Sequence, residues 1–170
     1  GCQIYRNADR IASIALDSGR CIIGMMAYKG NCYTLMSRYE RDSAVMPAEI
    51  FKNGHPAMKF LPEFRAVAFD MSDGHFYTLG LMDSTDITVY RDGVRAISMP
   101  LSAGNPSAVG VLGQDIYVAH QPSDSSVVIT RNGKRLMDIP GKLEDARNTL
   151  IYADKYMQEL SVTIDQLKRT

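Results

Sequence analysis

The sequence predicts an all-β protein, namely a β-propeller built from four-stranded antiparallel blades of about 40 residues each. Three markers that recur at this interval lead to the prediction. Runs of strand-forming residues centre on tyrosines spaced 44, 40 and 39 residues apart: Tyr33, Tyr77, Tyr117 and Tyr156. A basic residue followed by Asn or Asp recurs at spacings of 46, 39 and 40 residues: Asn7, Asn53, Asp92 and Asn132. An apolar residue followed by proline ends three of the copies, at Pro62, Pro100 and Pro140. A β-sandwich also has regular short strands, but it does not repeat its sequence at a fixed interval.

One copy, residues 107–140, shows how four strands follow from the sequence. The strands are expected at 108–112, 116–120, 127–131 and 134–139. Gly113 marks the turn between the first two strands. Asn132-Gly133 marks a tight hairpin between the last two, because a type I′ turn needs positive φ at both central residues. Pro140 ends the last strand because proline has no N–H to donate to a ladder.

The number of blades follows from where the copies begin and end. Two strands are expected in 2–16, three whole units at about 20–62, 64–100 and 107–140, and two strands in 149–160. Four blades result if the first and last pairs form one split blade, which closes the ring and removes open sheet edges.

Two alternatives to this closure stay open. In one, the chain is half of a larger propeller, completed by a second copy in a homodimer or by further sequence. In the other, the last segment is a helix, because its apolar residues also recur every three or four positions from Leu143 to Leu167. Residues 161–170 are assigned to neither a strand nor a helix.

Length and charge narrow the function classes. The 170 residues are expected to form a single domain, with 19 basic and 19 acidic residues and therefore zero formal net charge. A protein that coats nucleic acid needs net positive charge, so we expect no nucleic-acid partner. No apolar run approaches the roughly 20 residues of a membrane-spanning helix, so we expect no transmembrane segment.

Three cysteines, Cys2, Cys21 and Cys32, bear on the compartment. An odd number cannot pair fully within one chain, and no C-x-x-C spacing suggests a zinc site or a redox pair. We therefore expect three buried or half-buried thiols. In an alternative interpretation, Cys2 carries the lipid anchor of a processed bacterial lipoprotein.

The repeat also carries a resemblance to known proteins. Its clearest copy reads apolar-x-apolar-x-Gly-x-Asp-Ile-Tyr-Val-Ala over 109–119, followed after a loop by apolar-x-basic-Asn-Gly over 129–133. This unit resembles the β-propeller repeats of uncharacterised secreted and lipid-anchored bacterial proteins, and it is distantly similar to Kelch-type blades. The similarity covers about 20–140. It implies a propeller fold and an extracytoplasmic location (periplasmic, cell-surface or secreted), and it implies no reaction, because propellers host many unrelated activities.

The sequence gives no sign of a metal or a cofactor, and we expect neither. His55, His75 and His120 occupy different places in the repeat, whereas a metal site built by repeat symmetry would use matching ones. The chain also lacks the serine-hydrolase elbow, the P-loop and the zinc-protease motif. No catalytic residue is therefore assigned.

Two charged patterns follow the repeat. Basic residues precede the recurring Asx of each hairpin: Arg6, Lys52, Arg91 and Arg131. We interpret them as edge charge that discourages sheet-to-sheet aggregation, and alternatively as a ring of cations on one face. The segments that lead into the first strand of each unit carry a second set: Arg20, Arg65, Asn105 and Arg147. At a propeller's channel mouth these four residues would suit a carboxylate, a sulfate or an acidic glycan, through paired N–H donors.

From these observations we expect a binding or assembly module, more readily than an enzyme, that recognises a protein or glycan partner through one propeller face. One alternative is a carbohydrate-active hydrolase or lyase, which would need two carboxylates at the channel mouth, for which Glu63 and Glu144 are the candidates. Another is a structural subunit that completes a larger propeller by dimerisation.

Overall fold

The computed structural model describes residues 2–6, 9–14, 20–38, 47–82 and 85–140, and within these ranges the chain is all-β, as predicted. The strands form four antiparallel sheets. The only other regular element in these ranges is the short 3-10 helix η1 (Leu101–Ala103).

The first sheet has two strands and the other three have four each, paired in chain order. The first sheet holds β1 (Cys2–Arg6) and β2 (Asp9–Ile14). The second holds β3 (Arg20–Tyr28), β4 (Asn31–Arg38), β5 (Glu49–Lys52) and β6 (His55–Lys59). The third holds β7 (Phe64–Ser72), β8 (His75–Met82), β9 (Asp86–Arg91) and β10 (Val94–Pro100). The fourth holds β11 (Asn105–Leu112), β12 (Asp115–Ser123), β13 (Ser126–Arg131) and β14 (Lys134–Pro140).

The four strands expected in residues 107–140 are therefore all present. The strands expected at 149–160, and with them the closure of a ring, lie outside the described residues.

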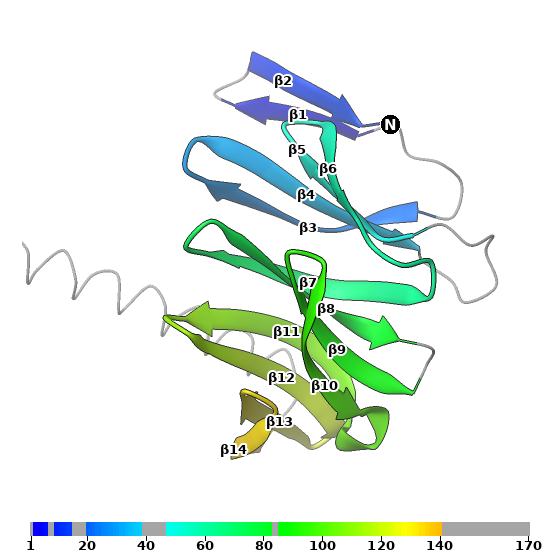
Figure 1. Cartoon of the computed structure of the whole chain (residues 1–170), viewed down its shortest axis with the longest axis vertical. Helices are drawn as coiled ribbons and strands as arrows, with labels where there is room; N and C mark the ends of the chain where they lie inside the picture. The colour runs from blue at the N-terminus through cyan, green and yellow to red at the C-terminus, as the bar shows by residue number, and fades with distance from the viewer. Residues whose placement is uncertain (1, 7–8, 15–19, 39–46, 83–84, 141–170) are drawn as a thin grey trace, which may run out of the picture.

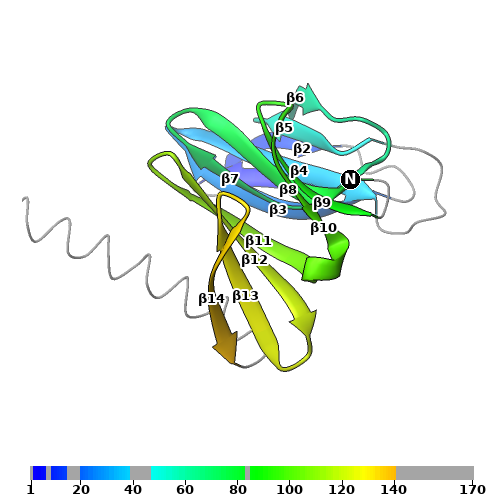
Figure 2. The same ribbon diagram turned by 60° about the horizontal axis from the view of Figure 1, so that its bottom comes forward.

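The four sheets are stacked in chain order (Figure 1). β3 and β4 contact β7, and β7 and β8 contact β11. We call β3, β7 and β11 the inner strands, since each begins its sheet and lies beside the neighbouring sheet. The first and last sheets lie at opposite ends of this stack (Figures 1 and 2).

Apolar side chains fill the spaces between successive sheets, because alternate residues of a strand point to opposite faces. The first and second sheets meet at Ile4, Ile14, Met36 and Phe51. The second and third meet at Tyr33, Leu35, Ala48, Ile50, Phe60, Phe64, Ala66, Met82 and Tyr90. The third and fourth meet at Tyr77, Leu79, Leu81, Ile87, Val89, Met99, Ile116 and Val118. Each of the large side chains stabilises the fold by about 1.5–3 kcal/mol on burial.

The sheets share their irregularities as well as their strands. In all four, the outermost hairpin has one extra residue at the same point of its last strand: Ile11, Ala57, Ala96 and Leu136. The three inner strands share a second bulge, at Ile23, Val67 and Ser107. A β-bulge bends its strand and increases the local twist, so the same bend recurs in each sheet.

The tight hairpin turns predicted from Asx-Gly are confirmed. Asn53, Asp92 and Asn132 have φ of 49°, 49° and 51°, and the glycine that follows each also has positive φ. Both central residues thus have the left-handed backbone that a type I′ turn requires.

Within the described ranges, no helix has the length and apolar character needed to cross a bilayer.

Candidate functional site

In three of the sheets, the recurring Asx of the hairpin makes the same two hydrogen bonds to the neighbouring strand. The Asn132 backbone N–H donates to the Ile116 carbonyl at 2.8 Å, and the Ile116 N–H donates to Asn132 Oδ1 at 2.9 Å. The same two bonds join Asn53 to Cys32 and Asp92 to Phe76. We call this pair of bonds the Asx clamp. Because the clamped residue precedes the tyrosine of each copy, Tyr33, Tyr77 and Tyr117 lie in matching settings.

The second polar partner of each clamp differs in chemistry. Asn53 Nδ2 donates to Asn31 Oδ1 at 2.9 Å, and Asn132 Nδ2 donates to Asp115 Oδ1 at 2.6 Å. In the third sheet, His75 Nδ1 lies 2.5 Å from Asp92 Oδ2. These three pairs are structural contacts within a sheet, and they explain the polar residues that precede each tyrosine run.

The basic residues before the hairpin Asx pack against their own sheets. Lys52 and Arg91 lie over the rings of Tyr33 and Tyr77, at 5.9 Å and 5.8 Å from the ring centroids. The Arg131 guanidinium lies 3.9 Å from an Asp115 carboxylate oxygen. Such contacts favour edge and packing roles over a ring of cations open to a ligand.

The structure places the predicted binding residues by register. Arg65 pairs with Leu81, and Asn105 pairs with Gln121. Leu81 and Gln121 each lie four residues after the tyrosine of their copy. Arg65 and Asn105 therefore occupy equivalent positions on adjacent inner strands.

Arg20 does not share this position, because it lies opposite Arg38, five residues after Tyr33. Cys21 occupies the equivalent position instead. A one-residue offset places a residue on the alternate face of a strand, so the register does not extend the Arg65–Asn105 equivalence to Arg20. Arg147 lies outside the described residues.

Arg65 has the chemistry of an anion-binding residue. Its side chain is half-buried, and within the described ranges it has no hydrogen bond or ion pair. A guanidinium presents paired N–H donors that match a carboxylate or a sulfate. Asn105, which is exposed, supplies both a donor and an acceptor at the equivalent position.

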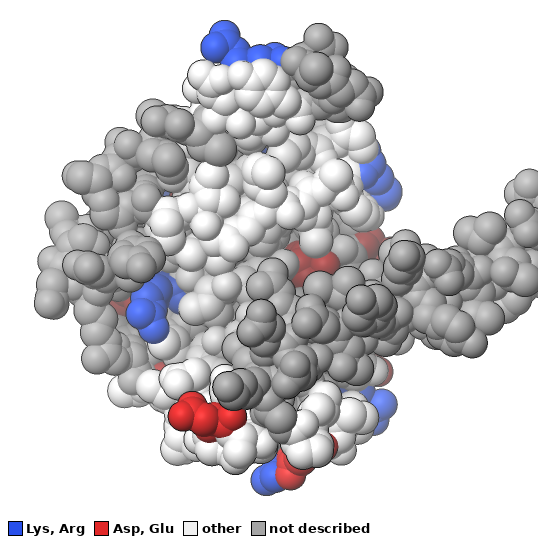
Figure 3. Space-filling view, turned by 180° about the vertical axis from the view of Figure 1, so that it is seen from behind, with Lys and Arg blue, Asp and Glu red and all other residues white. Residues whose placement is uncertain are grey.

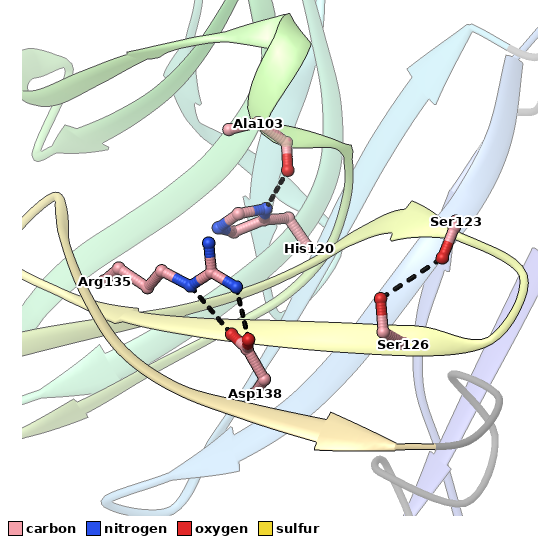
Figure 4. A network of polar contacts seen from close by, with 6 residues as sticks. All are labelled: Ala103, His120, Ser123, Ser126, Arg135 and Asp138. Atoms are coloured by element: carbon pink, nitrogen blue, oxygen red, sulfur yellow. Dashed lines mark hydrogen bonds and ion pairs between the residues drawn. The ribbon is translucent and has the colours of Figure 1, made fainter.

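The three histidines lie in unlike settings, and the described residues hold no group of three His, Cys, Asp or Glu placed to bind a metal ion. His55 is exposed at the start of β6. His120 on β12 is 3% exposed, and its Nδ1 lies 2.7 Å from the Ala103 carbonyl of η1 (Figure 4). In this contact Nδ1 donates to the carbonyl, and Nε2 is buried without a hydrogen-bond partner among the described residues. An unpaired buried polar atom costs stability, and one such atom alone does not define a site.

Two of the predicted thiols are confirmed. Cys21 and Cys32 are free and half-buried. Of the two carboxylates considered for catalysis, Glu63 is exposed in the turn before β7, and Glu144 lies outside the described residues.

The described charges do not gather on the face seen from behind. Figure 3 shows the Lys and Arg side chains there as separate points, with acidic side chains between some of them. This distribution matches the balanced charge of the sequence.

The chain matches no protein-family model, and no curated protein matches it.

Proposed function

We propose that this chain is a β-propeller-type binding module, not an enzyme, which recognises an acidic glycan or an acidic protein segment. The site lies where the inner strands β7 and β11 begin. The observation that carries the proposal is Arg65, a half-buried residue whose side chain has no hydrogen bond or ion pair in the described ranges. Asn105 occupies the equivalent position on the next inner strand.

The stacking of the sheets supports the propeller part of the proposal. Three four-stranded sheets repeat the same pairing order, the same two bulges and the same Asx clamp. Their inner strands are neighbours, as they would be in blades around a common axis. By its resemblance to the repeats of secreted and lipid-anchored bacterial propellers, we extend the proposal to a location outside the cytoplasm.

The test is a titration of the full chain with a panel of sulfated and carboxylated oligosaccharides and acidic peptides. We expect one class to bind. Arg65→Ala should weaken that binding about tenfold or more, since a charge-assisted pair contributes about 1.5–3 kcal/mol. The matched control is Arg95→Ala, which removes an exposed arginine from the outermost strand β10. Failure of the parent chain to bind any acidic ligand, or equal losses in the two variants, would refute the proposal.

A second candidate function is structural. The first sheet has only two described strands, and it lies at the opposite end of the stack from the last sheet (Figure 1). The described sheets would then be one arc of a larger propeller, which a second copy completes. Measurement of the mass in solution separates the two candidates, because only the second requires a dimer.

A further inference from the structure

The last sheet has an apolar face that points away from the rest of the stack. Alternate residues of its strands form this face, which we call the outer face: Ala108, Tyr117, Ala119, Val127, Ile129 and Ile139. Its opposite face packs against the third sheet through Ile116 and Val118. Alternate side chains of β12 therefore point to the third sheet and to the outer face.

Three of the six side chains of the outer face are buried, and Ala108, Tyr117 and Ile139 are half-buried. Val127 is 0%, Ala119 5% and Ile129 6% exposed. A side chain on an uncovered sheet is flanked by its neighbours within the sheet but keeps its outward side in solvent. Burial this complete requires a layer of atoms on the outward side.

None of the described strands supplies that layer. Every described residue of the outer-face cluster belongs to the last sheet itself. The third sheet and η1 contact β11 and β12 from the opposite side. The described residues therefore do not include a cover for the outer face.

The other end of the stack gives a contrast. On the first sheet, Tyr5 is 57% exposed, and Gln3 and Ser13 are exposed beside it. That outward face is polar and open to solvent. The outer face at the opposite end is apolar instead. Exposure to water would therefore be unfavourable for the last sheet but not for the first.

We propose that residues 141–170, which follow β14 directly, cover the outer face. Thirty residues follow Pro140, and their apolar side chains recur every three or four positions: Leu143, Ala146, Leu150, Ala153, Met157, Leu160, Ile164 and Leu167. An apolar series of this kind can pack on one side against a sheet and present polar residues on the other. In this arrangement the chain itself ends the stack, so no sheet of a second copy can pack on this face, and the structural candidate described above would be excluded.

The direct test places a photoreactive residue on the outer face of the full chain. Tyr117, which is half-buried there, is replaced by p-benzoyl-phenylalanine, and the control carries the same replacement at Tyr5 on the exposed face. After illumination, tryptic peptides are analysed by mass spectrometry. We expect the Tyr117 probe to attach to peptides 148–155 or 156–168 of the same chain, and the Tyr5 probe not to do so. Attachment to a second copy, to another sheet or to no peptide of 141–170 would overturn the proposal.

A second experiment tests the apolar series itself in the chain that carries the probe at position 117. Leu150→Asp with Met157→Asp should reduce attachment severalfold, because two charges would then face an apolar surface. The matched control, Thr149→Asp with Gln158→Asp, adds the same charge outside the series and should leave the attachment unchanged. Equal yields in the two variants, reduced or not, would contradict a specific contact through the series.

Discussion

Asp70 on β7 accepts a hydrogen bond through Oδ2 from the backbone N–H of Val111 on β11, at 2.8 Å. Its Oδ1 accepts from the N–H of Met71, also at 2.8 Å. Met71 lies opposite Phe76, and Val111 lies opposite Ile116, the residues that precede the tyrosine in their copies. One carboxylate thus joins equivalent backbone groups of two adjacent inner strands, whose free edges would otherwise leave an N–H unpaired.

Replacing this carboxylate should loosen the contact between the third and fourth sheets. In Asp70→Asn, one carboxylate oxygen becomes an NH2 group. This group is a donor, so it cannot accept a hydrogen bond from a backbone N–H. We expect the free energy of unfolding to fall by about 1.5–3 kcal/mol, since the lost bond has a charged acceptor. Urea denaturation measures the change.

The control for this prediction is Asp124→Asn in the exposed turn between β12 and β13. It removes the same charge at a position whose side chain makes no hydrogen bond or ion pair within the described ranges, and it should change the free energy of unfolding by no more than about 0.5 kcal/mol. If Asp70→Asn is as mild as this control, the carboxylate does not hold the two sheets together.

The Asx clamp makes a prediction that separates backbone strain from hydrogen bonding. Asn132→Gly keeps the positive φ and loses the side-chain bonds, which should cost about 1 kcal/mol. Asn132→Ala loses the same bonds and adds left-handed strain, for a total of about 2–3 kcal/mol. Thermal and urea unfolding should rank the parent above the glycine variant and the glycine variant above the alanine variant. Equal stability of the two variants would show that the turn conformation adds no strain.

A conservative exchange at the equivalent position provides the control. Asp92→Asn should stay within about 0.5 kcal/mol of the parent, because the amides of Asn53 and Asn132 make the same clamp in their own sheets. A large loss there would mean that the His75–Asp92 contact, and not the clamp, holds that turn.

The sequence could predict the hairpins because their chemistry is local. Asn-Gly and Asp-Gly tolerate positive φ at both central residues, so the turns are visible without any knowledge of packing. The bulges could not be predicted. The extra residues carry no distinctive signal: those of the hairpin bulge, such as Ala57 and Leu136, are aliphatic like many other strand residues, and the second bulge also takes Ser107. A bulge is fixed by how twisted strands pair across a sheet.

The candidate site was harder to predict than the strands, because it depends on register. Arg20 and Arg65 each begin a unit in the sequence, but the number of residues before the tyrosine differs by one, and only pairing shows this. The hydrogen-bond partner of His120 could not be predicted either, because it also depends on structure that the sequence pattern does not show. Its acceptor, Ala103, belongs to η1, a turn that the sequence pattern did not indicate.

A pair of glycines tests the packing around the candidate site. A Cβ added to Gly80 would lie 2.3 Å from the Arg65 carbonyl oxygen and 2.6 Å from the Phe64 ring. Phe64 is fully buried and cannot move away, so Gly80→Ala should destabilise the fold by about 1–3 kcal/mol. Because the clash displaces the backbone of Arg65, the variant should also weaken any ligand that Arg65 binds.

Gly110 is the matched control, since an added Cβ there meets nothing within 4 Å. Gly110→Ala should be neutral or stabilise the fold by about 0.5 kcal/mol, because alanine has less backbone freedom to lose on folding. Equal effects of the two substitutions, measured by urea denaturation, would contradict the close packing at Gly80.

The exposed pair Arg135 and Asp138 on β14 predicts a dependence of stability on pH. A regular strand would point residues three apart to opposite faces, but the extra residue Leu136 brings these two together (Figure 4). The hydrogen bond from Arg135 is the main cause that lowers the pKa of Asp138; loss of hydration opposes it, and the charge of Arg135 adds a smaller lowering. A lowered pKa in the folded state means that folding favours the ionised carboxylate.

The stabilisation from this pair is therefore present above the ordinary aspartate pKa of about 3.9, and it is lost as the pH falls through the lower folded pKa. Urea denaturation of the parent and of Asp138→Asn at a series of pH values measures it. We expect the parent to be the more stable near neutral pH, by a margin that stays constant down to about pH 5 and narrows below pH 4. Added salt should reduce the margin at neutral pH, because the pair is exposed to solvent. A margin that grows on acidification would mean that the protonated carboxyl is the form that folding favours.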